Sequence, residues 1–239
     1  MLRAVVDPII ALLYPQQCHV CSGDVESMDN GIACEQCWQA TRIFDGSEPL
    51  CEKCGAMLAS RHDRCLHCVD THFDRAIAIG VYEKALAATV VRLKKVPHLP
   101  ARTNRCLIER IARMEADGPS IIIPIPLSKR RSIERGFNQA EIVARVIARS
   151  TGTQIFSNCL VRSAHTPIHR IGMDKKAREA TVKNAFTVRS PRLVDGRDVI
   201  LVDDVLTSGS TASACAKELK KNGAGRVTVV TLARAVMRQ

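Results

Sequence analysis

Aromatic side chains are scarce in this 239-residue chain, where Trp, Tyr and Phe together make up 3% of the sequence. This scarcity disfavours a stacking platform for single-stranded nucleic acid, because such a surface needs exposed aromatic rings. No apolar run approaches the roughly 18 to 20 residues of a transmembrane helix, so we expect no membrane association. The chain also lacks a G-x-x-x-x-G-K-[ST] segment, which disfavours a P-loop NTPase.

The amino-terminal stretch 1–14 has some features of an export signal, namely Arg3 followed by an apolar run at 9–13. Asp7 and Pro8 interrupt it, however, and no small-x-small cleavage site follows before Cys18. We therefore expect a short amphipathic helix packed on the protein and a cytoplasmic location. Thiols stay reduced in the cytoplasm, so clustered cysteines favour metal binding over disulfides.

Eight of the eleven cysteines form four C-x-x-C pairs within 18–68. Two pairs can surround one Zn²⁺ with four thiolates, so the pattern predicts two structural zinc sites with no open position for a substrate. The spacers of twelve and ten residues suit short hairpins and favour sequential pairing, with a cross-braced pairing or an iron–sulfur cluster as alternatives. The predicted ligands are Cys18, Cys21, Cys34 and Cys37 for one site, and Cys51, Cys54, Cys65 and Cys68 for the other.

The histidines near these pairs and the remaining cysteines are not predicted to bind metal. Four histidines near the pairs could replace a thiolate ligand, but four complete pairs make surface positions the better interpretation for His19, His62, His67 and His72. The three remaining cysteines have no partner pattern, and we expect small buried side chains at Cys106, Cys159 and Cys215.

Charge is distributed unevenly along the chain. The net charge is +11, yet residues 1–72 contain 5 Lys/Arg and 10 Asp/Glu, whereas 73–239 contain 30 and 14. We interpret 1–72 as a small acidic domain and 73–239 as a basic one. An acidic zinc domain is a poor clamp for DNA and is better suited to dock on a basic surface, such as its own neighbour.

Strand-like and helical segments alternate after residue 72, which predicts an α/β domain with a parallel sheet flanked by helices. We expect strands at 73–82, 120–126, 154–156, 198–202 and 226–232. We expect helices at 83–95, 102–115, 138–150, 175–183 and 209–222.

The segment VILVDDVLTSGST at 199–211 predicts a ligand site. An apolar strand ends in two carboxylates, and open α/β sheets bind ligands at this end of their strands. A turn of small hydroxyl-bearing residues then opens a helix, whose N-terminus can bind phosphate. Carboxylates suit ribose hydroxyls, so we predict a ribose 5-phosphate site, with a solvated strand end as the alternative. The candidate residues are Asp203, Asp204, Val205, Leu206, Thr207, Ser208, Gly209, Ser210 and Thr211.

A basic segment follows the strand expected at 120–126. Lys129, Arg130, Arg131 and Arg135 fall within seven residues at the carboxyl end of that strand. Such a cluster suits a diphosphate. A solvated basic loop or a nucleic-acid contact is the alternative.

Together these segments resemble the ComF family, which joins a double zinc ribbon to a type I phosphoribosyltransferase domain. The stretch 199–211 is similar to the motif that binds phosphoribosyl diphosphate (PRPP) in those enzymes. The resemblance also includes IPIPLSKRRSIERGFNQAE at 123–141, R-x-x-x-T-P at 162–167 and R-x-x-x-V-x-x-A-F at 178–186.

The resemblance implies binding of PRPP with Mg²⁺ and transfer of phosphoribosyl to a nitrogen acceptor, with release of pyrophosphate. Asp203 and Asp204 would hold the ribose hydroxyls, and 207–211 would hold the 5-phosphate. The diphosphate would contact Arg130, Arg131, Arg135 and Lys94, although Lys94 is otherwise explained as a surface residue at a helix end. Arg178 would act with the aspartates as a catalytic residue, from a loop at 165–178 that closes over the reaction centre.

Two positions depart from the family pattern and leave the acceptor open. His169 stands where the family commonly has Gln, and Thr181 where it commonly has Asn. The alternative function is a non-catalytic accessory protein of DNA uptake that binds a nucleotide or PRPP. Its zinc ribbon would then dock a protein of the uptake machinery, and direct nucleic-acid binding is less favoured.

Overall fold

The computed structural model describes residues 16–60, 62–63, 65–66, 68–114, 120–162 and 185–236. The helices expected at 1–14 and 175–183 therefore lie outside the described residues, as do the loop expected to close over the site and His67. Among the described helices, none combines the length and the apolar character needed to span a membrane.

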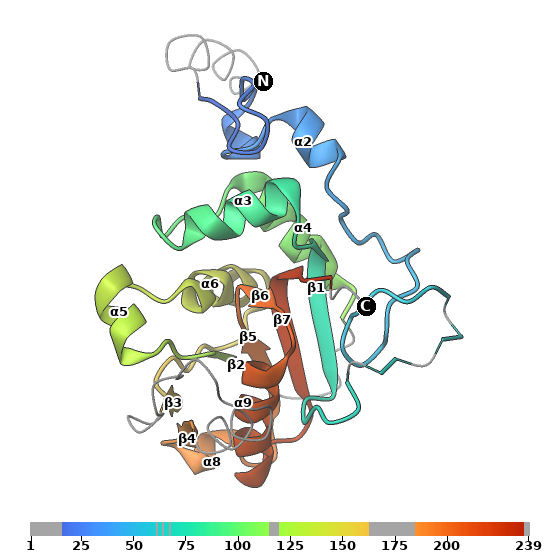
Figure 1. The fold of residues 1–239 in the computed structure, drawn as a ribbon. Coiled ribbons are helices and arrows are strands. Elements are labelled where there is room, and N and C mark those ends of the chain that lie inside the picture. Colours follow the sequence, from blue (N-terminus) through green and yellow to red (C-terminus); the bar gives the residue numbers. More distant parts are fainter. Residues whose placement is uncertain are drawn as a thin grey trace, which may run out of the picture.

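A parallel sheet forms the centre of the protein, and the predicted α/β fold class is confirmed (Figure 1). Its strands lie in the order β1 (Arg75–Val81), β7 (Val227–Arg234), β5 (Asp198–Val202) and β2 (Ser120–Pro124). The short β6 (Val205–Leu206) pairs with the end of β7. At 154–156, where the sequence predicted a strand, the chain adds only a single parallel bridge to the edge of β2.

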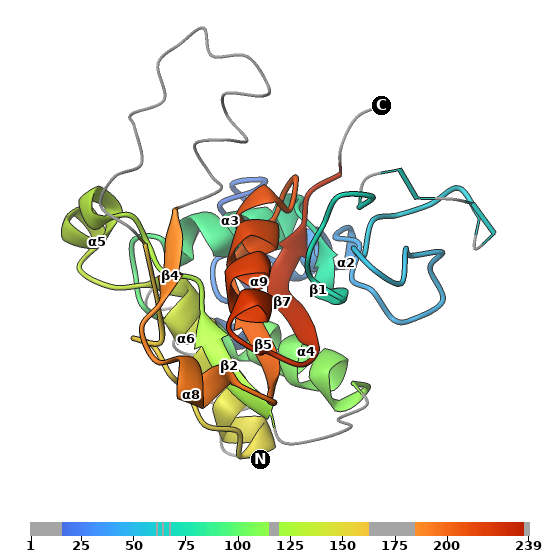
Figure 2. The same cartoon turned by 90° about the horizontal axis from the view of Figure 1, so that it is seen from below.

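Helices cover both faces of the sheet, which explains the unbroken apolar run of β5. One face packs on α3 (Lys84–Leu93), α4 (Ala101–Ala112) and α6 (Gln139–Thr151). The other packs on α9 (Ser210–Lys221), which crosses the sheet in Figure 2. Ile200 and Val202 of β5 face the first layer, and Val199 and Leu201 face the second.

The segment after β2 differs from the sequence prediction. No helix was expected in the basic segment at 129–135, but it forms the helix α5 (Lys129–Arg135). The Ser128 side chain caps this helix by accepting a hydrogen bond from the Arg131 amide at 3.4 Å. Gly136 ends it in the left-handed conformation, with a φ of 72°. Two local capping signals therefore bound a short helix in this basic segment.

Three further elements were not predicted. β3 (Leu160–Arg162) and β4 (Phe186–Val188) form a small antiparallel pair, and α8 (Pro191–Val194) follows with proline in its first turn. The pair packs with its buried Leu160, Phe186 and Val188 into the same apolar layer as α9. It thus stands beside the main sheet rather than extending it.

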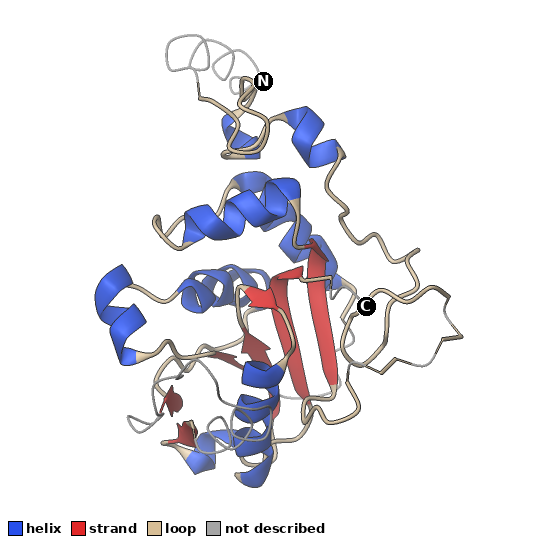
Figure 3. Cartoon of the chain, viewed as in Figure 1, coloured by secondary structure: helices blue, strands red, loops and turns tan. Residues whose placement is uncertain are grey.

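The amino-terminal residues 16–72 contain little regular structure apart from η1 (Met28–Asn30) and α2 (Glu35–Gln39), as Figure 3 shows. Trp38 anchors this part on α4. Its ring is 1% exposed, its Nε1 donates to the Asn30 carbonyl at 2.9 Å, and the Arg102 guanidinium lies 5.1 Å from the ring centroid. Arg102 also donates to the Asn30 side chain and to the Glu35 carboxylate.

Charge complementarity supports the same contact. Arg105 of α4 pairs with Asp29 at 3.0 Å, and Arg42 pairs with Glu83, at the start of α3, at 2.7 Å. Three of these four residues are well exposed, so each pair is worth at most about 1 kcal/mol and mainly orients the contact. Two pairs, Arg105–Asp29 and Arg102–Glu35, join an acid of the amino-terminal part to a base of α4, as the charge distribution suggested. The Arg42–Glu83 pair has the opposite polarity.

Replacing Trp38 with alanine should destabilise the protein by about 3 kcal/mol or more, because it leaves a large cavity between α2 and α4. Arg105→Ala should cost less than about 1 kcal/mol, since its ion pair is exposed. Both are measured by urea denaturation at constant zinc. Circular dichroism is the suitable probe, because Trp38 is the chain's single tryptophan. Equal effects of the two substitutions would contradict this account.

Candidate functional site

A cleft opens at the carboxyl ends of β2 and β5 and brings together most of the residues predicted from the sequence. The predicted residues that line it are Asp203, Asp204, Val205, Leu206, Thr207, Gly209, Thr211, Lys94, Arg131 and Arg135. Ser208 and Ser210 belong to the same loop but do not line the cleft. Arg130 instead forms an ion pair with Glu134 at 2.6 Å, and Arg178 lies outside the described residues.

The two aspartates follow β5 directly and are held by main-chain hydrogen bonds. The Asp203 amide donates to the Val230 carbonyl at 3.1 Å, and the Leu232 amide donates to the Asp204 carbonyl at 3.1 Å. The Asp204 amide in turn donates to Oδ1 of Asp203 at 2.9 Å. Pairing with β7 thus fixes both carboxylates at the edge of the sheet.

The surroundings of the carboxylates disfavour the charged form of Asp203. Burial raises the pKa of Asp203 to about 7, the neighbouring charge of Asp204 contributes, and Lys94 acts weakly in the opposite direction. The Lys94 Nζ lies 3.8 Å from Oδ2 of Asp204, at the carboxyl end of α3. A carboxyl group that titrates near neutrality in a cleft is characteristic of a binding or catalytic site.

The loop between β6 and α9 has the geometry of an anion site. Gly209 caps α9 with a φ of 78°, a conformation that glycine adopts at little cost. Within the described residues, the amides of Thr207, Ser208 and Gly209 have no hydrogen-bond acceptor. These amides and the N-terminus of a twelve-residue helix provide donors and a positive dipole for a phosphate.

Among the cleft residues that were not assigned a role from the sequence are two with long polar side chains, Gln139 and Arg162. Gln139, in the first turn of α6, is 2% exposed, and its Nε2 has no hydrogen-bond partner among the described residues. Arg162 of β3 reaches the cleft with its guanidinium 5.4 Å from the centroid of Phe186. Both fall within motifs noted above, but only the packing of α6 and β3 shows that they face the cleft.

The eight paired cysteines form two groups, each with the sequential pairing favoured by the spacing. Within a group the sulfur atoms lie within 4.8 Å of one another, and Cys21–Cys34, Cys51–Cys68 and Cys54–Cys65 are 3.6, 3.6 and 3.5 Å apart. Four ligands about 2.3 Å from one tetrahedral zinc ion would be separated by about 3.8 Å. The groups therefore fit one such ion each, and a four-iron cluster fits less well because each of its thiolates binds a different iron.

Comparison with known protein families agrees with this geometry. Residues 9–69 match the family described as "double zinc ribbon domain", and residues 135–238 match the family described as "phosphoribosyl transferase domain". The fold and the cysteine groups thus define a double zinc ribbon joined to a phosphoribosyltransferase-type domain.

Curated relatives extend the similarity over nearly the whole chain. Competence protein F of Haemophilus influenzae is 31% identical over 228 residues, which cover 92% of this chain and 97% of that protein. The DNA utilization protein YhgH of Escherichia coli K12 is 30% identical over 94% of this chain and all of that protein. The protein belongs to the ComF family.

Solved structures resemble the chain more loosely. The glutamine PRPP amidotransferase from B. subtilis, complexed with ADP and GMP, aligns with a TM-score of 0.36 and 20% identity. The alignment covers 56% of this chain and 28% of that one. Adenine phosphoribosyltransferase from Leishmania tarentolae gives a TM-score of 0.34 and covers 55% of this chain and 68% of that one.

Asp203→Asn should stabilise the unliganded protein at alkaline pH. The folded pKa of Asp203 is raised to about 7 from an unfolded value near 3.8, so this carboxyl favours unfolding increasingly as the pH rises between those values. The advantage of the variant should grow between about pH 4 and 7 and level off at higher pH, at on the order of 1 to 3 kcal/mol.

Denaturation at several pH values with zinc held constant measures this effect. The exposed substitution Glu109→Gln serves as the control and should show no such trend. A destabilised Asp203→Asn variant at pH 8 would show that the carboxylate is satisfied rather than strained.

Proposed function

We propose that the protein binds PRPP with Mg²⁺ in this cleft and transfers its phosphoribosyl group to a nitrogen acceptor. The observation that carries the proposal is the presence, in one cleft, of a carboxylate pair, loop amides without an acceptor among the described residues, and the two arginines of α5. Each matches one part of the ligand: the ribose hydroxyls, the 5-phosphate and the diphosphate. The role of each residue below is part of the proposal.

The ligand would lie along the carboxyl edge of the sheet. Its 5-phosphate occupies the loop 207–211 and accepts hydrogen bonds from the amides of Thr207, Ser208 and Gly209. Its ribose hydroxyls donate to Asp203 and Asp204. Its diphosphate extends toward Arg131 and Arg135 on α5, where two guanidinium groups offset its charge.

Gln139 supplies an independent argument for a ligand at this place. Its amide Nε2 is buried and unpartnered among the described residues, which costs free energy unless an acceptor arrives. Gln139 lines the same cleft as the two aspartates and the arginines of α5. An oxygen of the ribose or the diphosphate would provide the missing acceptor.

The donor set also suits magnesium. Mg²⁺ commonly binds one or two carboxylates together with substrate phosphates, and Asp203 and Asp204 offer such oxygens beside the proposed diphosphate. The ion would neutralise negative charge on the departing diphosphate. It would also lower the pKa of Asp203, which burial and Asp204 hold high in the free protein.

The reaction forms one bond and breaks one. A nitrogen of the acceptor forms a bond to C1 of the ribose as the C1–O bond breaks, and the electron pair leaves with pyrophosphate. Positive charge develops on the sugar in the transition state, next to the carboxylates of Asp203 and Asp204, which stabilise it electrostatically. Arg131 and Arg135 hold the leaving group.

The two cysteine groups are proposed to hold zinc in a structural role. All four positions around each ion would be filled by thiolates, which leaves none for a substrate. The ions order residues 16–72, a segment with little regular secondary structure of its own.

Binding is tested by calorimetry with PRPP and Mg²⁺ on protein verified to contain two zinc ions per chain. We expect a Mg²⁺-dependent signal that weakens about tenfold or more in Asp203→Asn, Asp204→Asn and Gln139→Met, because each loses a hydrogen bond to a charged or buried group. Affinity should fall as the pH drops below about 7, where Asp203 becomes protonated. Glu109→Gln should bind like the wild type.

Turnover is tested in the same preparation by pyrophosphate release from PRPP with a panel of nucleobases and amines. Release that requires both an acceptor and the two aspartates is the expected result. Wild-type protein that shows no calorimetric signal would overturn the proposal.

A second candidate function, a non-catalytic role in DNA uptake, is favoured by the names of the relatives, "competence protein" and "DNA utilization protein". If the protein contacts DNA through phosphates, its log affinity for a single-stranded oligonucleotide should fall with log salt by about 0.7 per contact. Arg130→Ala should reduce that slope, because Arg130 is exposed outside the cleft. A slope near zero would exclude direct DNA binding.

A further inference from the structure

Arg234, the last residue of β7, is an arginine with unusual surroundings. It is 4% exposed, and the described residues place no carboxylate within ion-pair distance of it. Its partners are main-chain carbonyls. Nε donates to Cys54 at 3.2 Å, and Nη1 donates to Leu206 at 2.8 Å, to Ala235 at 3.1 Å and to Thr207. A cation buried without a counter-ion is costly, so its hydrogen bonds must stabilise this particular arrangement of the chain.

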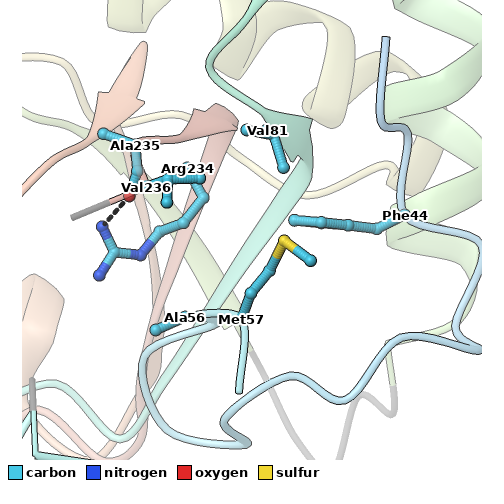
Figure 4. Close-up of a pocket in the computed structure, with 7 residues that line it drawn as sticks. All are labelled: Phe44, Ala56, Met57, Val81, Arg234, Ala235 and Val236. Atoms are coloured by element: carbon cyan, nitrogen blue, oxygen red, sulfur yellow. Dashed lines mark hydrogen bonds between the residues drawn. The ribbon is translucent and has the colours of Figure 1, made fainter. Parts of the chain in front are cut away.

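These carbonyls belong to segments that are distant in sequence. Cys54 is a member of the second cysteine group, whereas Leu206 ends β6 and Thr207 begins the loop proposed to hold the 5-phosphate. Figure 4 shows the Arg234 side chain on the same side as Ala56, two residues after Cys54, with the guanidinium turned toward the Ala235 carbonyl. One guanidinium therefore joins the second metal site to the ligand loop.

The contact with Leu206 and Thr207 determines where the loop amides point. In a trans peptide, the carbonyl of one residue and the amide of the next point in opposite directions. Since Arg234 binds the carbonyls of Leu206 and Thr207, the amides of Thr207 and Ser208 face away from it. These are two of the loop amides that have no acceptor among the described residues.

A second contact joins the same two regions. Phe73, just after the second cysteine group, is 1% exposed, and its ring lies 3.5 Å from the position that a Cβ on Gly209 would occupy. The His72 amide donates to Oγ of Ser213 in α9 at 3.0 Å. Lys53 fixes this connection to the second group by donating to the Thr71 carbonyl at 2.9 Å.

The metal-binding turn is what places the Cys54 carbonyl. The Gly55 amide donates to the Cys51 carbonyl at 2.8 Å, and the Gly55 φ of 64° lets the turn approach β1. A Cβ at Gly55 would lie 3.1 Å from the Ala76 carbonyl oxygen. A metal ion that holds the Cys51 and Cys54 thiolates together therefore keeps the acceptor of Arg234 in position.

We propose that Arg234 is a positioning residue. It couples metal binding by the second cysteine group to the orientation of the amides in the loop 207–211. Metal in the second group raises affinity for a phosphate monoester at 207–211, and metal in the first group does not. The inference rests on the proposed function for the identity of the ligand. The orientation of the loop amides, in contrast, is present in the unliganded protein. Because coupling is reciprocal, the ligand should also strengthen retention of the second metal ion.

The test compares Arg234→Lys with Arg102→Lys, a matched change in an arginine that contacts the first cysteine segment instead. Hydrogen exchange of the 205–211 peptide is measured without ligand, and affinity for PRPP with Mg²⁺ by calorimetry. We expect Arg234→Lys to retain both zinc ions, to exchange faster in this peptide and to bind about tenfold more weakly, because lysine cannot span the same carbonyls. Arg102→Lys should match the wild type in both measurements.

A second measurement uses the unmodified chain, in case Arg234→Lys does not fold. Zinc transfer to a chromogenic chelator is followed with and without saturating PRPP and Mg²⁺. One of the two ions should leave about fivefold more slowly with ligand. Cys21→Ser, which removes a ligand of the first group, should keep the slowed phase.

The outcomes separate the two proposals. If wild-type protein does not bind PRPP, the proposed function fails, and the ligand-free exchange data still decide the coupling. If PRPP binds but Arg234→Lys keeps wild-type exchange and affinity, or if ligand leaves both zinc phases unchanged, the coupling is overturned.

Discussion

The parallel pairing of β5 between β2 and β7 is the constraint on which the cleft depends. It brings the carboxyl ends of two strands to one edge, so that the aspartates after β5 and the basic α5 after β2 face the same space. β7 holds the aspartates through its main chain and ends in Arg234, which holds the following loop. The residues of the cleft come from segments more than 100 positions apart in the sequence. The pairing of β5 with β2 and β7 brings these segments together.

Several buried polar groups in and beside the cleft are electrostatically unfavourable in the unliganded protein. Burial and a neighbouring carboxylate raise the pKa of Asp203, Gln139 has an unsatisfied amide among the described residues, and Arg234 is buried without a carboxylate partner there. Such strain is expected where a ligand supplies the missing partner, and the packed sheet with its two apolar layers supports it.

Regular elements and local motifs were largely predictable from the sequence, because apolar periodicity and C-x-x-C spacing reflect local geometry. The strands β1, β2, β5 and β7 and the sequential cysteine groups follow those patterns closely. The helix α5 was not predicted, because its basic residues suggested a loop. The cap at Ser128 and the left-handed Gly136 stabilise a helix there instead. Gln139, Arg162 and Arg234 could not be assigned, since their roles depend on which way a side chain points after packing. The ligand-binding roles of the cleft residues, and all roles within 163–184, stay predictions.

The most direct test of the central claim is a crystal structure of the protein with PRPP and Mg²⁺. The account predicts the 5-phosphate on the amides of 207–209, the ribose hydroxyls on Asp203 and Asp204, and the diphosphate toward Arg131 and Arg135. A ligand bound elsewhere on the protein, or one whose diphosphate occupies the 207–211 loop instead, would contradict it.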